Sequence, residues 1–475
     1  AKVVGEGANL GMTQQARIDY GLAGGRCNSD AIDNSAGVNT SDVEVNIKIA
    51  LGAAIRAGKL DLKRRNRLLA AMTGEIAALV LRNNYLQPLA ISVSVRNGAD
   101  ELGHAQRMMT ELEARGLLDR AVEVLPDDAA IDRRRADGRT LTRAETGVLL
   151  AYGKLTLAHD LAESDVVDDP LLAEALVAYF PRRMRAAFAT EIATHRLRRE
   201  IIATAVANDM VNRGGPTYVT RIADRTGAGP AVIARAHAAA SAMLGLADLD
   251  AAVDRLDGKI AGALQLDLYA AIQQTLVGAA IWLAGNASFA RGIGATVEAF
   301  RPTVAATGEA LPEALPPGLA ADIAARAKAW QAAGVPVGLA RRIANLPALA
   351  AAADIHLIGA ETGAPAGRVA RVYFAAAEAF RAVAIGRVAS TINAADPVEA
   401  MARDRAIDAL TAIHRRIVAA VMATRGDDPL ATWIAARKDA VDRAVAGIAT
   451  VLGGGEPSLA RVTVATDLLA GLARD

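Results

Sequence analysis

The stretch NSDAIDNSAGVNTSDVEVNIKI, residues 28–49, changes its hydrophobic period part-way along. Its DAID segment at 30–33 predicts a short strand, and the Asn-Ser-Ala-Gly run that follows predicts a turn. Beyond the turn the period is that of a helix with one apolar face, at Val43, Ile47, Leu51 and Ile55. The candidate N-caps of this helix are Asn39, Thr40 and Ser41. Gly58 is placed to end it. The stretch therefore marks a change from mixed α/β structure to helices.

The N-terminal segment AKVVGEGANLG carries a strand signal that runs into a glycine-rich turn. KVV at 2–4 predicts a strand, and ARIDY at 16–20 is a further candidate. Gly5 and Gly7 have the first spacing of a dinucleotide phosphate loop, but Leu10 stands where that loop has Gly or Ala. A phosphate-binding loop is therefore disfavoured, and the strand signals are confined to the first forty or so residues.

The rest of the chain has the composition of a helical protein, because aromatics are only 3% and alanine is abundant. Thr142 and Glu145 have capping-box spacing and predict a helix to about Leu161. One long helix is predicted over 182–213, and an irregular boundary loop over 123–140. Further helices are predicted over 63–81, 99–114, 230–244, 259–285, 318–332, 366–383, 397–424 and 428–451. The predicted fold is mostly α: a short α/β remnant followed by a large all-α region.

Charge and cysteine content exclude several classes of protein. Fifty-three basic residues nearly balance 52 acidic ones, so neither a nucleic acid nor an anionic membrane surface is expected as a partner. The only cysteine, Cys27, cannot form a disulfide within the chain, and we expect a cytoplasmic protein. The most apolar stretch, at 260–285, contains Asp267 and three glutamines and is predicted to be a core helix rather than a membrane span.

The six histidines do not form a metal-binding pattern. They lie at positions 104, 159, 195, 237, 356 and 414, without an i, i+4 pair and without a cysteine cluster. No metal site is predicted.

Two short motifs and one longer segment resemble a known family. EGAN at 6–9 and NSAGVNTSDVE at 34–44 resemble two signatures of glutamate dehydrogenases, and NDMVNRGGPTYVTRI at 208–222 resembles the C-terminal helical region of the large bacterial NAD-dependent class. The resemblance implies that residues 1–58 are the end of a Rossmann-type NAD-binding domain. Residues 59–475 would then be a C-terminal helical domain, with a candidate subdivision near 123–140.

The resemblance also implies roles for individual residues. Asn9 would lie beside the nicotinamide ribose of NAD, and Asn34 would face the nicotinamide carboxamide. Gly7 is also assigned to cofactor binding. Ser41 would donate to the distal carboxylate of glutamate. The family transfers a hydride from the Cα of L-glutamate to NAD, and the imine is then hydrolysed to 2-oxoglutarate and ammonia.

Some features of the family pattern differ here. Ala36 replaces a glycine of the family's turn, and Asp42-Val43 replace Tyr-Phe. The family's catalytic lysine and aspartate lie upstream of these motifs, so no catalytic residue is assigned here and this segment alone is expected to be inactive. We expect a piece of a longer polypeptide that works with its upstream domains, as a homo-oligomer.

A structural interpretation stays open beside this one. Asn34 is also a common turn residue, and Ser41 a common N-cap. The chain could therefore be a helical scaffold, or a regulatory or oligomerisation module, without catalysis of its own.

Overall fold

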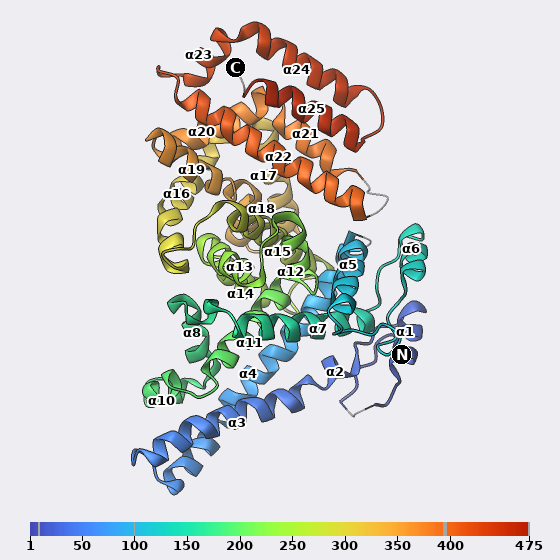
Figure 1. The fold of residues 1–475 in the computed structure, drawn as a ribbon, viewed down its shortest axis with the longest axis vertical. Coiled ribbons are helices and arrows are strands. Elements are labelled where there is room, and N and C mark those ends of the chain that lie inside the picture. Colours follow the sequence, from blue (N-terminus) through green and yellow to red (C-terminus); the bar gives the residue numbers. More distant parts are fainter. Residues whose placement is uncertain (8–9, 99, 393–396, 474–475) are drawn as a thin grey trace. The chain divides into compact units, whose positions relative to one another are not determined.

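The computed structural model describes residues 1–7, 10–98, 100–392 and 397–473, and these form helices joined by short loops (Figure 1). The first helices are α1 (Gln14–Leu22), α2 (Asp30–Asp33), α3 (Ser35–Arg56), α4 (Leu62–Asn97), α5 (Asp100–Ala114), α6 (Asp128–Ala136), α7 (Arg143–Ala162), η1 (Asp165–Asp168), α8 (Pro170–Tyr179), α9 (Arg182–Arg185), α10 (Ala189–Ala193), α11 (Arg198–Gly214) and α12 (Tyr218–Thr226).

The remaining helices are α13 (Pro230–Leu244), α14 (Leu246–Asp254), α15 (Gly262–Asn286), α16 (Ile293–Ala314), α17 (Pro317–Ala332), α18 (Val337–Leu349), α19 (Ala352–Thr362), α20 (Ala366–Ala379), α21 (Ala382–Ser390), α22 (Pro397–Met422), α23 (Pro429–Ala436), α24 (Lys438–Gly453) and α25 (Leu459–Gly471). Two compact units divide the chain. Unit 1 is residues 1–238 and 289–294, and unit 2 is residues 239–288 and 295–475.

The core of unit 1 is built around α7 and α11, which pack against each other and against α4. The predicted start of α7 is confirmed: the Thr142 hydroxyl accepts from the Glu145 N–H, and a Glu145 carboxylate oxygen accepts from the Thr142 N–H. Close packing requires glycine at 153, because a Cβ there would lie 3.0 Å from the Pro216 carbonyl oxygen.

In the described residues, strand-like backbone pairing is limited to one parallel bridge between Val3 and Arg26. The Val4 N–H donates to the Arg26 carbonyl at 2.9 Å, and the Arg26 N–H donates to the Lys2 carbonyl at 3.0 Å. The strand predicted at 2–4 is thus reduced to this bridge, and helix α1 makes the connection between its two sides.

The strand predictions at 16–20 and 30–33 are wrong. ARIDY lies inside α1, which Thr13 caps by accepting from the Ala16 N–H. DAID forms the single turn α2, in which the Asp33 N–H donates to the Ser29 carbonyl. Helical i, i+3 spacing puts two aspartates of this turn on one side, where both contact the N-terminal segment; a strand would have put them on opposite faces.

Helix α3 begins at Ser35, so the turn predicted at 34–37 and the N-caps predicted at 39–41 are also wrong. The Thr40 hydroxyl donates to the Ala36 carbonyl at 2.7 Å, inside the helix. The predicted end is confirmed, because Gly58 has φ of +72° and follows the last turn at Arg56.

The single helix predicted over 182–213 is broken into α9, α10 and α11. At the second break the His195 Nδ1 accepts from the Leu197 N–H at 3.1 Å, while its Nε2–H donates to the Asn46 carbonyl at 3.1 Å. A side chain therefore satisfies a backbone group that a continuous helix would have paired internally. The loop predicted over 123–140 contains helix α6, because Asp127 accepts from the Ala130 N–H and caps it.

Unit 2 is helical throughout its described residues, and α15 lies in its core, as predicted for 260–285. By length and composition alone α15 could cross a membrane, as could two pairs of bent helices. Two of its polar side chains are bonded to protein within unit 2: Gln265 donates to the Val253 carbonyl at 3.1 Å, and Trp282 donates to the Asp354 carboxylate at 2.8 Å. The same carboxylate accepts from Arg415.

Candidate functional site

A buried arginine joins the two motif segments at the N-terminus of unit 1. The Arg17 side chain is completely buried and donates to the Asn28 carbonyl at 3.0 Å. It forms an ion pair with Glu6, and its guanidinium lies 3.7 Å from the Asp30 carboxylate and 3.6 Å from that of Asp33. One guanidinium thus lies among three carboxylates, one from the N-terminal segment and two from α2.

The two aspartates of α2 also hold the glycine-rich segment directly. Asp30 accepts from the Leu10 N–H at 3.3 Å and from the Asn34 side-chain amide at 3.0 Å. Asp33 accepts from the Glu6 N–H at 3.2 Å and from the Asn28 amide at 2.9 Å. Glu6 and Leu10 are therefore held close to α2, which directly precedes α3.

Of the residues assigned to ligand contact, Asn34 is bonded to this network and Gly7 lies in the segment that the network holds. Asn34 is partly buried, and its bond to Asp30 fixes which way its amide faces. Gly7 is exposed, and a Cβ added there would meet nothing within 4 Å. Asn9 lies outside the described residues. Ser41 is exposed in the second turn of α3.

Ser41 shares its face of α3 with two exposed valines. Val38 is 67% exposed and Val45 is 50% exposed, and they lie three residues before and four residues after Ser41. This spacing places the three side chains in one stripe along the helix.

Amide side chains of α4 fix the start of α3. Gln87 donates to the Ser35 hydroxyl at 3.0 Å, and Asn83 donates to the Asn39 side-chain oxygen at 2.9 Å. Arg143 of α7 donates to the Asn28 side-chain oxygen at 3.1 Å and to the Ser92 hydroxyl at 2.8 Å. The motif segments are thus supported by α4 and α7.

The chemistry offered near the motifs is that of hydrogen bonding. Cys27 is buried and donates to the Arg17 carbonyl, and burial raises the pKa of its thiol although the charge of Arg17 lowers it. The cysteine is therefore a packing residue rather than a nucleophile. Among the described residues no group of three or more His, Cys, Asp or Glu side chains is arranged to hold a metal ion.

Two family models match this chain. Residues 138–471 match the one described as glutamate dehydrogenase, C-terminal. The chain belongs to the glutamate dehydrogenase family. Residues 1–94 match the one described as bacterial NAD-glutamate dehydrogenase, catalytic domain. The segments joined by Arg17 thus fall within the part that matches a glutamate dehydrogenase catalytic domain, and the family resemblance of the motifs is confirmed.

Three curated relatives carry the name NAD-specific glutamate dehydrogenase. The protein of Pseudomonas aeruginosa is 37% identical over 89% of this chain, which covers 26% of that protein. The protein of Halomonas elongata is 34% identical over 90% of this chain, again covering 26% of the relative. The protein of Mycobacterium tuberculosis is 32% identical over 98% of this chain, covering 29% of it. The chain spans little more than a quarter of these glutamate dehydrogenases and corresponds to a C-terminal part.

Sequence reasoning missed Arg17, Asp30 and Asp33 as residues that organise the site. The strand predicted at 16–20 contains Arg17. That prediction gave no reason to place the arginine near the carboxylates, so its role was missed. A usable signal was present: the i, i+3 pair of aspartates directly before the Asn-Ser-Ala-Gly run.

Proposed function

We propose that this chain is part of an enzyme that oxidatively deaminates L-glutamate to 2-oxoglutarate and ammonia with NAD. The observation that carries the proposal is the Arg17 network, which holds the exposed Gly7 segment beside Asn34 at the start of α3. This arrangement supplies one wall of a site, and the domains that precede it in the longer relatives supply the rest. The proposed enzyme is cytoplasmic and homo-oligomeric.

Residues 1–58 are proposed to be the end of a Rossmann-type NAD-binding domain, with residues 59–475 forming the helical domain and a subdivision near 123–140. The parallel pairing of Val3 with Arg26 across α1 supports this, because parallel strands need a crossover connection. Two edge segments of a larger sheet would pair in this way.

The described residues fit NAD in their chemistry. The exposed Gly7 leaves room for close approach of a ligand to the backbone, and the oriented Asn34 amide can hydrogen-bond a carboxamide. Asn9 is proposed to lie beside the nicotinamide ribose. Bound NAD supplies the hydride acceptor, and the role of this chain is to bind and orient.

Ser41 is proposed to donate its hydroxyl hydrogen to the distal carboxylate of glutamate. Its exposed position between Val38 and Val45 supports a contact with groups outside this chain. The alternative, a helical scaffold without a catalytic role, would contain the same Arg17 network, so a test of ligand binding is needed to separate the two.

The test of the proposal is Asn34→Ala in a polypeptide that includes the preceding domains. Loss of one hydrogen bond to a neutral group is expected to weaken NAD binding by about 1 kcal/mol, or roughly fivefold. Titration of NAD by calorimetry measures the change, and Asn66→Ala, at an exposed asparagine on α4, is the matched control. Unchanged NAD affinity and unchanged turnover in Asn34→Ala would favour the scaffold.

A further inference from the structure

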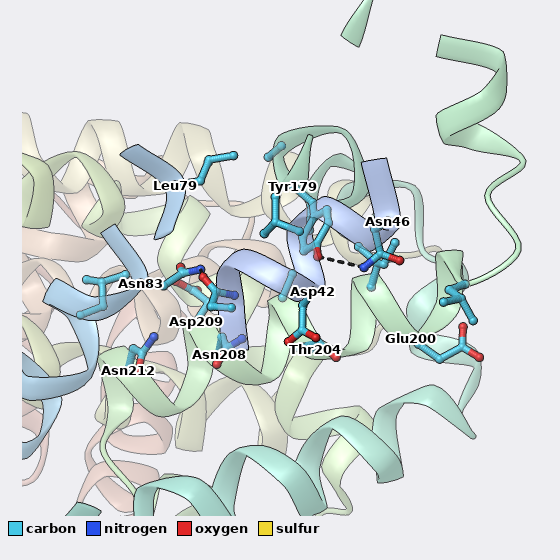
Figure 2. A pocket seen from close by; sticks show the side chains of 18 of the residues that line it. Asp42, Asn46, Leu79, Asn83, Tyr179, Glu200, Thr204, Asn208, Asp209 and Asn212 are labelled. Atoms are coloured by element: carbon cyan, nitrogen blue, oxygen red, sulfur yellow. Dashed lines mark hydrogen bonds between the residues drawn. The ribbon is translucent and has the colours of Figure 1, made fainter. Parts of the chain in front are cut away.

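A pocket of about 520 Å³ lies within unit 1, between α3, α4, α8 and α11 (Figure 2). Its volume is in the range of small-molecule sites. Asn39 and Asn46 of α3 line it, whereas Ser41 lies some 140° or more around the helix from both of them at 100° per residue. Ser41 itself does not line the pocket, but Val45, which shares the Ser41 face of α3, does. The pocket therefore adjoins the proposed glutamate contact without including Ser41.

Five asparagines line this pocket, and they come from three helices. Asn39 and Asn46 lie on α3, Asn83 lies on α4, and Asn208 and Asn212 lie on α11. Asparagine is unfavourable inside helices, because its side chain competes for backbone hydrogen bonds. Such a concentration in helix interiors indicates that the amides are there for hydrogen bonding at the pocket.

Two of these amides have an unused acceptor. The side-chain oxygens of Asn46 and Asn212 are buried and have no hydrogen-bond partner. Asn212 is only 7% exposed, and the Asn46 amide nitrogen already donates to the Tyr179 hydroxyl at 2.9 Å, the dashed line in Figure 2. An unpaired buried acceptor costs about 1 to 3 kcal/mol. A ligand with N–H donors would remove that cost.

The charged residues that line the pocket are all acidic. They are Asp42 of α3 and Glu200 and Asp209 of α11, without a lysine or arginine among the lining residues that the structure describes. Figure 2 labels Asp42 and Asp209, which come from two different helices, α3 and α11. Carboxylates in this arrangement attract a cation and repel an anion.

Asp209 is held in place by a chain of buried groups. Its carboxylate contacts the His237 Nε2 at 2.8 Å, and the His237 Nδ1 contacts the Tyr218 hydroxyl at 3.0 Å. Tyr218 is completely buried, and glycine is required at 214 because a Cβ there would lie 2.1 Å from the tyrosine ring. The 208–222 segment thus both lines the pocket and fixes one of its carboxylates.

We propose that this pocket binds a small organic cation with an alkyl body and N–H donors at its ends. The donors would satisfy the amide oxygens, the positive charge would lie near Asp42 and Asp209, and the alkyl body would contact the apolar wall. That wall is formed by Val43, Leu79, Leu86, Ile201 and Ala205. An inorganic cation would leave this wall without a partner.

The test uses 1,4-diaminobutane as the probe and calorimetry on the 475-residue chain at constant ionic strength. We expect saturable binding of one equivalent, with 1,4-butanediol binding at least tenfold more weakly. The proposal would be overturned if the diamine did not bind or if the diol bound equally well. It would also be overturned if potassium chloride at the same charge concentration displaced the diamine. The experiment needs neither NAD nor glutamate, so its outcome is independent of the proposed enzyme activity.

Two variants locate the binding. Asp42→Asn keeps the shape of an exposed side chain and removes the charge, and it is expected to weaken diamine binding about tenfold. Glu44→Gln is the control, because Glu44 is exposed on the same helix, pairs with Lys48 and does not line the pocket. Its diamine affinity should equal that of the unaltered chain. Equal affinities of the two variants would place the binding elsewhere and contradict the proposal.

Discussion

Ser41 is the residue from which the substrate proposal can be tested most simply. It is exposed in α3, so removing its hydroxyl group should leave the fold unchanged. In a polypeptide with the preceding domains, Ser41→Ala is expected to raise the KM for glutamate. The hydroxyl would donate to a charged carboxylate, and losing that hydrogen bond would weaken glutamate binding by about 1 to 3 kcal/mol.

Steady-state kinetics with glutamate and NAD varied separately measure this effect. Thr73→Ala, at an exposed threonine of α4 whose hydroxyl donates to the Ala70 carbonyl, serves as the control. A change in the KM for NAD alone would show that Ser41 is misplaced in the proposal.

Lys154 in α7 provides a second prediction for a single residue. Burial lowers the pKa of Lys154 to about 7, against an ordinary value near 10.5. Between these two values the unfolded chain binds more protons than the folded chain, so the free energy of unfolding should rise with pH from about 7 to 10.

Lys154→Met should remove this part of the pH dependence and stabilise the chain at pH 7 by about 1 to 3 kcal/mol, within the usual range for single substitutions. Chemical denaturation at several pH values measures both effects. Lys63→Met, at an exposed lysine of α4, should change neither. An unchanged pH dependence in Lys154→Met would contradict the prediction, because the dependence would then come from other groups.

At the scale of elements, the sequence predicted most reliably what local chemistry decides. The Thr142–Glu145 capping box and the left-handed Gly58 were recognisable because a few adjacent residues determine them. The start of α3 was not recognisable, because it depends on amides of α4. The break at His195 was not recognisable either, because it depends on a hydrogen bond to the Asn46 carbonyl. These partners lie far away in the sequence.

The site shows the same division. Gly7, Asn34 and Ser41 were found from motif residues, and their roles in ligand contact stay predictions. The part played by Arg17 was missed, because the spacing of the two aspartates does not show which cation α1 brings to them and to Glu6.

Arg17 also provides the prediction for this set of elements. Arg17→Met should leave three carboxylates without their shared cation, and removing one partner of a buried pair costs about 3 to 5 kcal/mol. We expect faster backbone hydrogen exchange in α1 and α2 and a lower free energy of unfolding. Arg26→Met, at an exposed arginine, is the control. Unchanged exchange in α1 would show that the network is not what holds these elements.

At the scale of the whole molecule, the chain is a C-terminal part of a glutamate dehydrogenase, and it covers 26–29% of three longer relatives. Its described residues near the motifs supply amides, a hydroxyl and three carboxylates grouped around Arg17. Binding and orientation are tasks such groups can perform, and proton transfer is proposed to belong to the preceding domains.

The most direct measurement of the central claim is hydrogen exchange in a polypeptide that includes those domains, with and without NAD and glutamate. If residues 1–58 form one wall of the site, bound ligands should slow the exchange of backbone amides at residues 5–11 and 30–37. Amides of unit 2 at residues 397–473 should be little affected. Ligand binding with turnover, but with unchanged exchange at 5–11 and 30–37, would contradict the account.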